Sequence, residues 1–305
     1  MDGGIVVAIT AKEIRVATDG EPRPSWVPAD LYPFASHFED INGSRVHYLD
    51  EGVGPPLILL HGNPTWSFLY RDVIAGLRDR YRCIAVDYPG FGLSQAAPGY
   101  GFTPAEHARV VEDLILRLDL PGATLMVQDW GGPIGFAVAT RHPDRFAAFV
   151  IGNTWAWPNS NLATQMFSRV LGGRIGGWLI LQRNFFVERI IPVGVGRKKL
   201  PEAVMDAYCG PFPTPQSRRP VHVFPHEILA SRPFLAEIES KLAVLGDRPA
   251  LIVWGNKDFA FRVAERERWE RVFPEHHTVV LDGAGHYIQE DAAQDIVAAI
   301  RNWRT

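Results

Sequence analysis

The stretch LMVQDWGGPIGFAVA, residues 125–139, decides the fold because an apolar run meets a glycine pair and then a helical pattern. The first part is apolar enough for a buried strand, and Gly131 and Gly132 leave room for a sharp turn. Asp129 stands at the tip of that turn, where the first amides of the following helix favour negative charge. We therefore predict a strained strand–turn–helix elbow that presents a carboxylate.

Short apolar runs recur on both sides of this elbow and alternate with helical patterns. Runs that are apolar along most of their length are typical of parallel strands covered on both faces. The expected strands are 56–61, 83–87, 124–129, 146–153, 250–255 and 277–281, preceded by a hairpin of 37–41 and 44–50. The expected helices are 68–79, 104–118, 131–142, 263–272 and 289–303. This alternation predicts an α/β fold with a mostly parallel, eight-stranded sheet flanked by helices.

The alternation stops between about Trp155 and Arg248, where the chain is rich in aromatic residues, proline and glycine. We expect a core formed by residues 1–155 and 243–305 and an inserted helical cap lobe at 156–242. Such a lobe would cover the carboxyl ends of the strands, where open α/β sheets bind their ligands. A separately folded domain with its own task is the alternative.

Before Asp40, the stretch GEPRPSWVPADLYPF (20–34) indicates an extended, proline-rich arm laid on the surface.

Composition excludes several classes of protein. The 305 residues are 47% hydrophobic and 21% charged, with a net charge of −3, so nothing indicates disorder or nucleic-acid binding. The two cysteines, Cys83 and Cys209, have no disulfide or metal-site spacing, and no phosphate loop follows the first strand. We expect no metal, cofactor or nucleic-acid partner. The N-terminal apolar patch is too short to span a bilayer, so we expect a cytoplasmic protein without a membrane partner.

Polar side chains follow the ends of four expected strands. Asn63 follows the first, Asp129 and Trp130 form the elbow, and Asp258 and His286 follow the last two. The carboxyl ends of parallel strands share one edge of a sheet, so we expect these side chains to converge. An aspartate after a strand can simply cap the next helix. The chain order of nucleophile, acid and base favours a catalytic set instead.

These motifs resemble those of the haloalkane dehalogenases, a family with the α/β-hydrolase fold. The pair HGNP and QDWGG is specific, whereas a glycine-rich elbow alone is a weak signal. The resemblance covers nearly the whole chain through YPFASHFEDING (32–43), VHYLDEG (46–52), HGNPTW (61–66), DYPGFGLS (87–94), VQDWGG (127–132), QRNFFVERIIPVGV (182–195), MDAYCGPF (205–212), GNKDF (255–259) and GAGHYIQED (283–291).

The resemblance implies hydrolysis of a carbon–halogen bond in a small halogenated aliphatic substrate, giving an alcohol, a halide ion and a proton. Asp129, already ionised at neutral pH, would attack carbon and form an alkyl ester. His286 would activate the water that hydrolyses this ester, and Asp258 would orient the imidazole. Asn63 and Trp130 would hold the departing halide with side-chain N–H groups and form the oxyanion hole with backbone N–H groups.

Other positions are less constrained by the resemblance. Phe186 and Leu229 are expected in the substrate pocket. Some relatives carry the second acid after the preceding strand, but this chain has Asn153 there. Trp157 and Trp178 are alternative halide donors, for which core packing is the favoured interpretation.

Three other interpretations stay open from the sequence. An epoxide hydrolase would share Asp129, His286 and Asp258, but it needs two cap tyrosines, and residues 156–243 contain only Tyr208. A fluoroacetate dehalogenase typically has arginine at the position of Trp130. A non-catalytic binding protein on this fold is also compatible with the sequence, since a fold does not prove activity. Preferred halogen, chain length and oligomeric state are not determined by the sequence.

Overall fold

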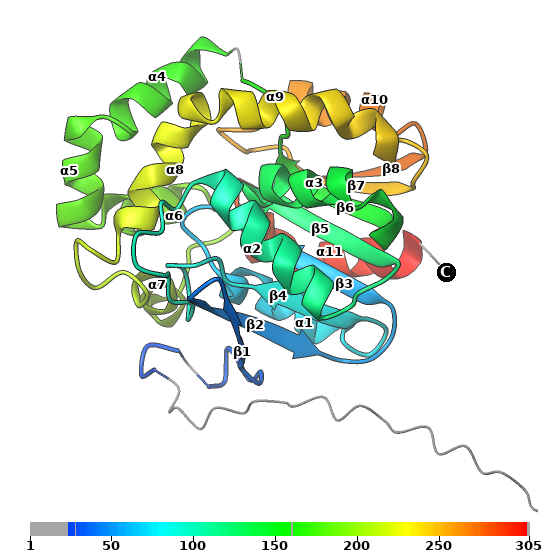
Figure 1. Cartoon of the computed structure of the whole chain (residues 1–305), viewed down its shortest axis with the longest axis horizontal. Coiled ribbons are helices and arrows are strands. Elements are labelled where there is room, and N and C mark those ends of the chain that lie inside the picture. Colours follow the sequence, from blue (N-terminus) through cyan, green and yellow to red (C-terminus); the bar gives the residue numbers. More distant parts are fainter. Residues whose placement is uncertain (1–23, 28, 160, 304–305) are drawn as a thin grey trace, which may run out of the picture.

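An eight-stranded sheet runs through the molecule in the order β1-β2-β4-β3-β5-β6-β7-β8 (Figure 1). The computed structural model describes residues 24–27, 29–159 and 161–303. β2 pairs antiparallel with β1 and β4, whereas all the other neighbouring strands pair parallel. The mostly parallel α/β sheet predicted from the sequence is therefore confirmed. The strands are β1 (His37–Ile41), β2 (Ser44–Glu51), β3 (Pro56–Leu60), β4 (Arg82–Val86), β5 (Ala123–Asp129), β6 (Phe146–Thr154), β7 (Ala250–Gly255) and β8 (His276–Leu281).

Helices cover both faces of the sheet, which is why its central strands are apolar throughout. α1 packs against α11, while α2 and α9 pack against α3, and Figure 1 shows α2 and α3 in front of the strands and α11 behind them. Every residue of β5 is buried. The core helices are η1 (Ser67–Tyr70), α1 (Arg71–Leu77), α2 (Pro104–Arg117), α3 (Gly131–Arg141), η2 (Pro143–Arg145), α10 (Val263–Val272) and α11 (Ile288–Trp303).

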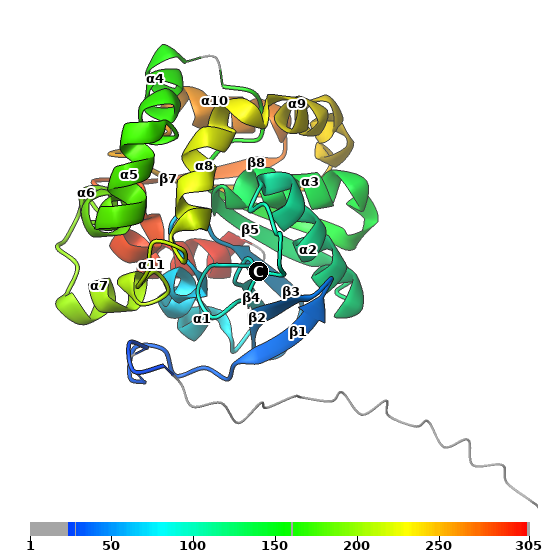
Figure 2. The same cartoon turned by 60° about the vertical axis from the view of Figure 1, so that its left-hand side comes forward.

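The segment between β6 and β7 is helical, and α4, α5 and α8 pack on one another beside the sheet (Figures 1 and 2). α9 contacts both α8 and the core helix α3, so it joins this segment to the layer that covers the sheet. The boundaries expected at 156 and 242 stay a prediction. The elements are α4 (Leu162–Leu171), α5 (Arg174–Arg183), the π-helical turn η3 (Phe186–Ile190), α6 (Ile191–Val193), α7 (Glu202–Cys209), α8 (Arg219–Ala230), α9 (Arg232–Lys241) and η4 (Leu242–Leu245).

The described part of the N-terminal arm corrects the expectation of a segment laid on the surface. Val27, Tyr32 and Phe34 are buried, and the Tyr32 hydroxyl lies 2.6 Å from Oγ of Ser67. Aromatic side chains of the arm pack on Trp66, whose ring centroid is 5.1 Å from that of Tyr32. Apolar burial thus overrides the proline-rich pattern here. Residues 20–23 and 28 of the predicted arm lie outside the described residues.

No helix of the described chain is long and apolar enough to cross a membrane. In residues 24–27, 29–159 and 161–303, no group of three or more His, Cys, Asp and Glu side chains could hold a metal ion. Cys83 is buried and Cys209 half-buried, and both are free thiols.

Candidate active site

The turn between β5 and α3 forms the predicted elbow. Asp129 has φ +49°, a left-handed conformation that is costly for a residue with a side chain. The hydroxyl of Thr154 donates to the Asp129 carbonyl at 2.5 Å and helps to hold it there. A Cβ atom on Gly131 would collide with the carbonyl oxygen of Leu60, and one on Gly62 would collide with the Asp129 side chain. Glycine is required at both positions because the backbone at the end of β3 and just after it lies against the elbow.

The two carboxylate oxygens of Asp129 have different surroundings. Oδ1 accepts a hydrogen bond from the backbone N–H of Asn63 at 2.8 Å, and the backbone N–H of Trp130 also stabilises the carboxylate. Oδ2 lies 3.6 Å from Nε2 of His286. Burial raises the pKa of Asp129 above its ordinary value, although His286 and the two amides oppose this effect. One oxygen is therefore held by backbone donors while the other faces the imidazole.

Behind the imidazole lies the second carboxylate. Nδ1 of His286 is 3.0 Å from Oδ2 of Asp258, and Oδ1 of Asp258 accepts from the Ala260 N–H at 2.6 Å. Burial alone lowers the pKa of His286, but the Asp258 carboxylate and, more weakly, Asp129 raise it above its usual value. The three side chains predicted from the ends of β5, β7 and β8 thus lie in series, as in a nucleophile–base–acid triad.

Two buried amide side chains hold this series, and the sequence analysis assigned no role to either. Asn153 donates from Nδ2 to Oδ2 of Asp258 at 2.9 Å and accepts the Gly255 N–H on Oδ1 at 2.8 Å. Nε2 of Gln128 lies 3.2 Å from Nε2 of His286. The sequence positions of both residues could have indicated this role, because Gln128 immediately precedes the elbow and Asn153 stands at the end of the neighbouring strand.

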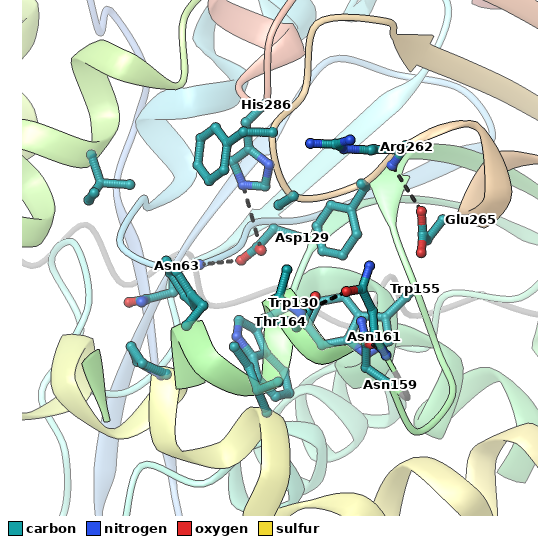
Figure 3. Close-up of a pocket in the computed structure, with 18 of the residues that line it drawn as sticks. Asn63, Asp129, Trp130, Trp155, Asn159, Asn161, Thr164, Arg262, Glu265 and His286 are labelled. Carbon is teal, nitrogen blue, oxygen red and sulfur yellow. Dashed lines mark hydrogen bonds and ion pairs between the residues drawn. The ribbon is translucent and has the colours of Figure 1, made fainter. Parts of the chain in front are cut away.

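A cavity of about 550 Å³ opens onto Asp129 (Figure 3). Its volume falls within the range of about 300–1,000 Å³ that is usual for small-molecule sites. The loop after β3, the elbow, the loops after β6, β7 and β8, and the helices α4, η3 and α8 all contribute to it. Asn63, Trp130, Phe186 and His286 line it, as expected.

The expectation that Leu229 lines the pocket is wrong. Pro225 and Ile228 are the lining residues on α8, and Leu229 is not among them. Adjacent residues of a helix point in directions about 100° apart, so the inward face could not be fixed from the sequence without knowing how α8 sits.

The tryptophans proposed as alternative halide donors also lie away from the cavity. Trp157 is buried and packs with its ring centroid 4.9 Å from that of Trp269, as expected for core packing. Trp178 is exposed, so neither interpretation given to it holds. Trp155, which the sequence analysis passed over, lines the cavity, and its ring centroid lies 4.7 Å from that of Trp130.

The side chain of Asn63 is held at the edge of the cavity. Its Nδ2 donates to the Val221 carbonyl at 3.3 Å, which leaves a second N–H of the amide group. Trp130, whose indole N–H can only donate, packs against Phe224 with ring centroids 5.1 Å apart. The cavity next to Asp129 is therefore bordered by two side chains able to donate hydrogen bonds to an anion.

The strand order, the elbow carboxylate and the adjoining His286–Asp258 pair define a protein of the α/β-hydrolase class. Residues 55–189 match a family model described as the alpha/beta hydrolase fold. Haloalkane dehalogenase 2 of Mycobacterium tuberculosis is 50% identical over 272 residues, which cover 88% of this chain and 95% of that protein. The chain therefore belongs to the haloalkane dehalogenase family, and the resemblance stated from its motifs is confirmed.

Two further comparisons extend this result. A crystal structure of a haloalkane dehalogenase from Bradyrhizobium elkani superimposes with a TM-score of 0.81 at 27% identity, covering 88% of this chain and 97% of that one. A cis-3-alkyl-4-alkyloxetan-2-one decarboxylase of Shewanella oneidensis is 33% identical over 288 residues, 90% of each chain. The fold is thus shared with a protein that is named for different chemistry.

Proposed function

We propose that this protein hydrolyses a carbon–halogen bond in small haloalkanes to give an alcohol, a halide ion and a proton. The observation that carries the proposal is the position of the Asp129 carboxylate. Its Oδ1 is held by the Asn63 N–H at 2.8 Å, while Oδ2 faces His286 at the wall of a largely apolar cavity.

In the first step, Oδ2 of Asp129 attacks the carbon that bears the halogen. A carbon–oxygen bond forms, the carbon–halogen bond breaks, and the halogen leaves with the bonding electrons as halide. The product is an alkyl ester of Asp129. A carboxylate suits this displacement because it needs no deprotonation at neutral pH, even though burial raises its pKa.

The departing halide needs hydrogen-bond donors, since negative charge grows on it in an apolar cavity. The indole N–H of Trp130 and the free N–H of the Asn63 amide are two donors that border the cavity next to Asp129. Phe186 lines the same cavity and would contact the alkyl chain.

In the second step, His286 takes a proton from water, and the resulting hydroxide attacks Cγ of the ester. The developing oxyanion is Oδ1, which already accepts from the Asn63 N–H, and the Trp130 N–H also stabilises this carboxylate. Collapse releases the alcohol and restores the Asp129 carboxylate, and His286 returns its proton to solvent. Asp258 orients the imidazole and stabilises its charged form.

Two alternatives receive less support. An epoxide hydrolase needs acids from the cap, yet the Tyr208 hydroxyl is buried and donates to Glu290, and Tyr287 is the one tyrosine among the described residues that line the cavity. The decarboxylase relative is 33% identical, against 50% for the dehalogenase relative.

A cytoplasmic location and the absence of nucleic-acid or membrane partners stay predictions.

The test is halide release. Wild-type protein should liberate bromide from 1-bromobutane and 1,2-dibromoethane in proportion to alcohol formed, and Asp129→Ala should liberate none. Diol formation from styrene oxide without bromide release would assign an epoxide hydrolase instead. Tight binding of 1-bromobutane or 1,2-dibromoethane without turnover would indicate a non-catalytic binding protein.

A further inference from the structure

Apart from the buried residues around Asp129, the cavity is lined by polar residues that are exposed or half-buried. Asp129, Trp130 and Trp155 are buried at its inner end, whereas the segments that begin α4 and α10 are exposed or half-buried at its opening. These polar residues, here called the rim, are Asn159, Asn161, Thr164, Arg262 and Glu265. Figure 3 shows Arg262 and Glu265 higher in the view than Asn159, Asn161 and Thr164.

The amide groups of the rim present their donor ends. Oδ1 of Asn159 already accepts from the Asn161 N–H at 2.7 Å, and Oδ1 of Asn161 accepts from the Ala163 N–H at 2.9 Å, where it caps α4. Their oxygens are therefore occupied by local backbone. Neither NH₂ group donates a hydrogen bond to any residue that the structure describes, so both are available to a ligand.

Arg262 adds a positive charge to the same rim. Its side chain is exposed and forms no ion pair within the described chain. The nearby Glu265 carboxylate is engaged differently, since its Oε2 accepts the backbone N–H of Arg262 at 2.9 Å and caps α10. The guanidinium group is thus not paired with the Glu265 carboxylate, although the negative charge of Glu265 opposes the binding of an anion at this place.

We propose that this rim binds a carboxylate at the end of the substrate remote from the halogen, so that ω-haloalkanoates are preferred over haloalkanes of the same length. A carboxylate only accepts hydrogen bonds and matches the planar guanidinium fork, which suits a rim of amide and guanidinium donors. The apolar side chains of Phe167, Phe186 and Ile228, which also line the cavity, would contact the methylene chain. This inference rests on the proposed function and names the substrate class of the same site.

The experiment compares kcat/KM for 6-bromohexanoate and 1-bromohexane, which differ in the terminal carboxylate and not in the reacting end. For the wild type, the ratio of the two kcat/KM values should favour 6-bromohexanoate, and it should fall about two- to five-fold in Arg262→Gln, the range for an exposed charge pair. Arg262→Lys should keep part of the preference, and Glu265→Gln should increase it. Arg271→Gln, an exposed change on the same helix outside the cavity lining, is the matched control and should leave the ratio as it is.

An Arg262→Gln variant that slows both substrates equally would overturn the inference, because Arg262 would then act on halide release or on the fold. Bromide release from 1-bromohexane with no preference for the carboxylate would also overturn it while leaving the proposed function intact. If neither compound releases bromide, the proposed function fails, and calorimetry with hexanoate decides separately. Hexanoate that binds more tightly than 1-hexanol, and more weakly to Arg262→Gln, would still support the anion site, and equal binding would refute it.

Discussion

The side-chain nitrogen of Gln128 lies 3.2 Å from Nε2 of His286 and 3.1 Å from its carbonyl oxygen. An amide NH₂ group can only donate, so this contact favours the neutral imidazole in which Nε2 accepts and the proton lies on Nδ1, 3.0 Å from Asp258. This is the tautomer that a general base needs. Gln128 therefore holds the imidazole ready to take a proton on the nitrogen that faces Asp129.

Replacing Gln128 with methionine, which keeps most of the buried volume, removes that donor. We expect hydrolysis of the ester to slow about two- to ten-fold at pH 7, the effect of one hydrogen bond, with formation of the ester little changed. The pKa of His286 should rise, because the donor stabilised the neutral ring. Single-turnover kinetics that resolve the two steps check this, and an unchanged hydrolysis step would show that Gln128 only fills space.

The pH dependence should separate the two steps. Hydrolysis requires neutral His286, so its rate falls as the pH drops through the pKa of that residue. In the free protein the Asp129 charge helps to raise this pKa, and conversion of Asp129 to an ester removes that contribution. When hydrolysis limits turnover, the acid limb of kcat should therefore lie at lower pH than the His286 pKa measured by NMR in the free protein. Coincidence of the two values would contradict the assigned ester.

Protonation of the Asp129 carboxylate should make kcat/KM fall at low pH. Its carboxylate must be ionised to attack, and burial raises its pKa above the ordinary value of an aspartate. As the pH is lowered, the alkylation rate measured by rapid mixing should therefore fall at a higher pH than it would for an exposed aspartate. Alkylation that persists to pH values well below 3.8 would show that the carboxylate is not desolvated before substrate binds.

The two hydrogen-bond donors next to Asp129, the side chains of Trp130 and Asn63, can be tested one at a time. Trp130→Phe keeps an aromatic ring beside Phe224 and removes the N–H, so kcat/KM for 1-bromobutane should fall about 10²-fold, as for loss of one oxyanion-type donor. Asn63→Leu should have an effect of similar size through the side chain, since the backbone N–H stays. Bromide should also inhibit both variants more weakly. Unchanged bromide inhibition would place the halide elsewhere.

Much of the fold followed from the sequence because parallel strands buried on both faces must be continuously apolar. β1 and β7 lie at the residues where they were expected, and each of the other expected strands differs by one residue at one end or, for β4, at both ends. Buried parallel strands also bring Asp129, Asp258 and His286 to one edge, so their order along the chain was informative. The convergence of these three side chains was therefore predictable from the strand ends, whereas the roles proposed for them come from the family resemblance.

The features that escaped prediction depend on packing between distant segments. Leu229 was expected in the pocket, but the phase of α8 turns Ile228 there. The arm looked extended and exposed, yet Tyr32 is buried against Trp66. Trp155 lines the cavity only because β6 ends beside the elbow. None of these contacts has a local sequence signal.

A buried ion pair between two core helices accepts a hydrogen bond from the helical segment between β6 and β7. Arg71 on α1 forms a bidentate pair with Glu290 on α11 at 2.5 and 2.8 Å, and the Tyr208 hydroxyl on α7 donates to the same carboxylate. Glu290→Gln would leave the Arg71 charge buried without its partner, so the free energy of unfolding should fall by about 3–5 kcal/mol. Tyr208→Phe, which keeps the pair, should cost about 1.5–3 kcal/mol. Denaturant titration checks both values, and a Glu290→Gln variant as stable as wild type would contradict this account.

The most direct test of the central claim is the mass of a trapped intermediate. His286→Phe removes the base of the second step and leaves Asp129 free to react, so incubation with 1-bromobutane should add one butyl group to the intact protein. Peptide mapping should place that group on Asp129, and the double variant with Asp129→Ala should gain no mass. Bromide release from His286→Phe with no adduct, or an adduct on any other residue, would contradict the assignment of Asp129 as the nucleophile.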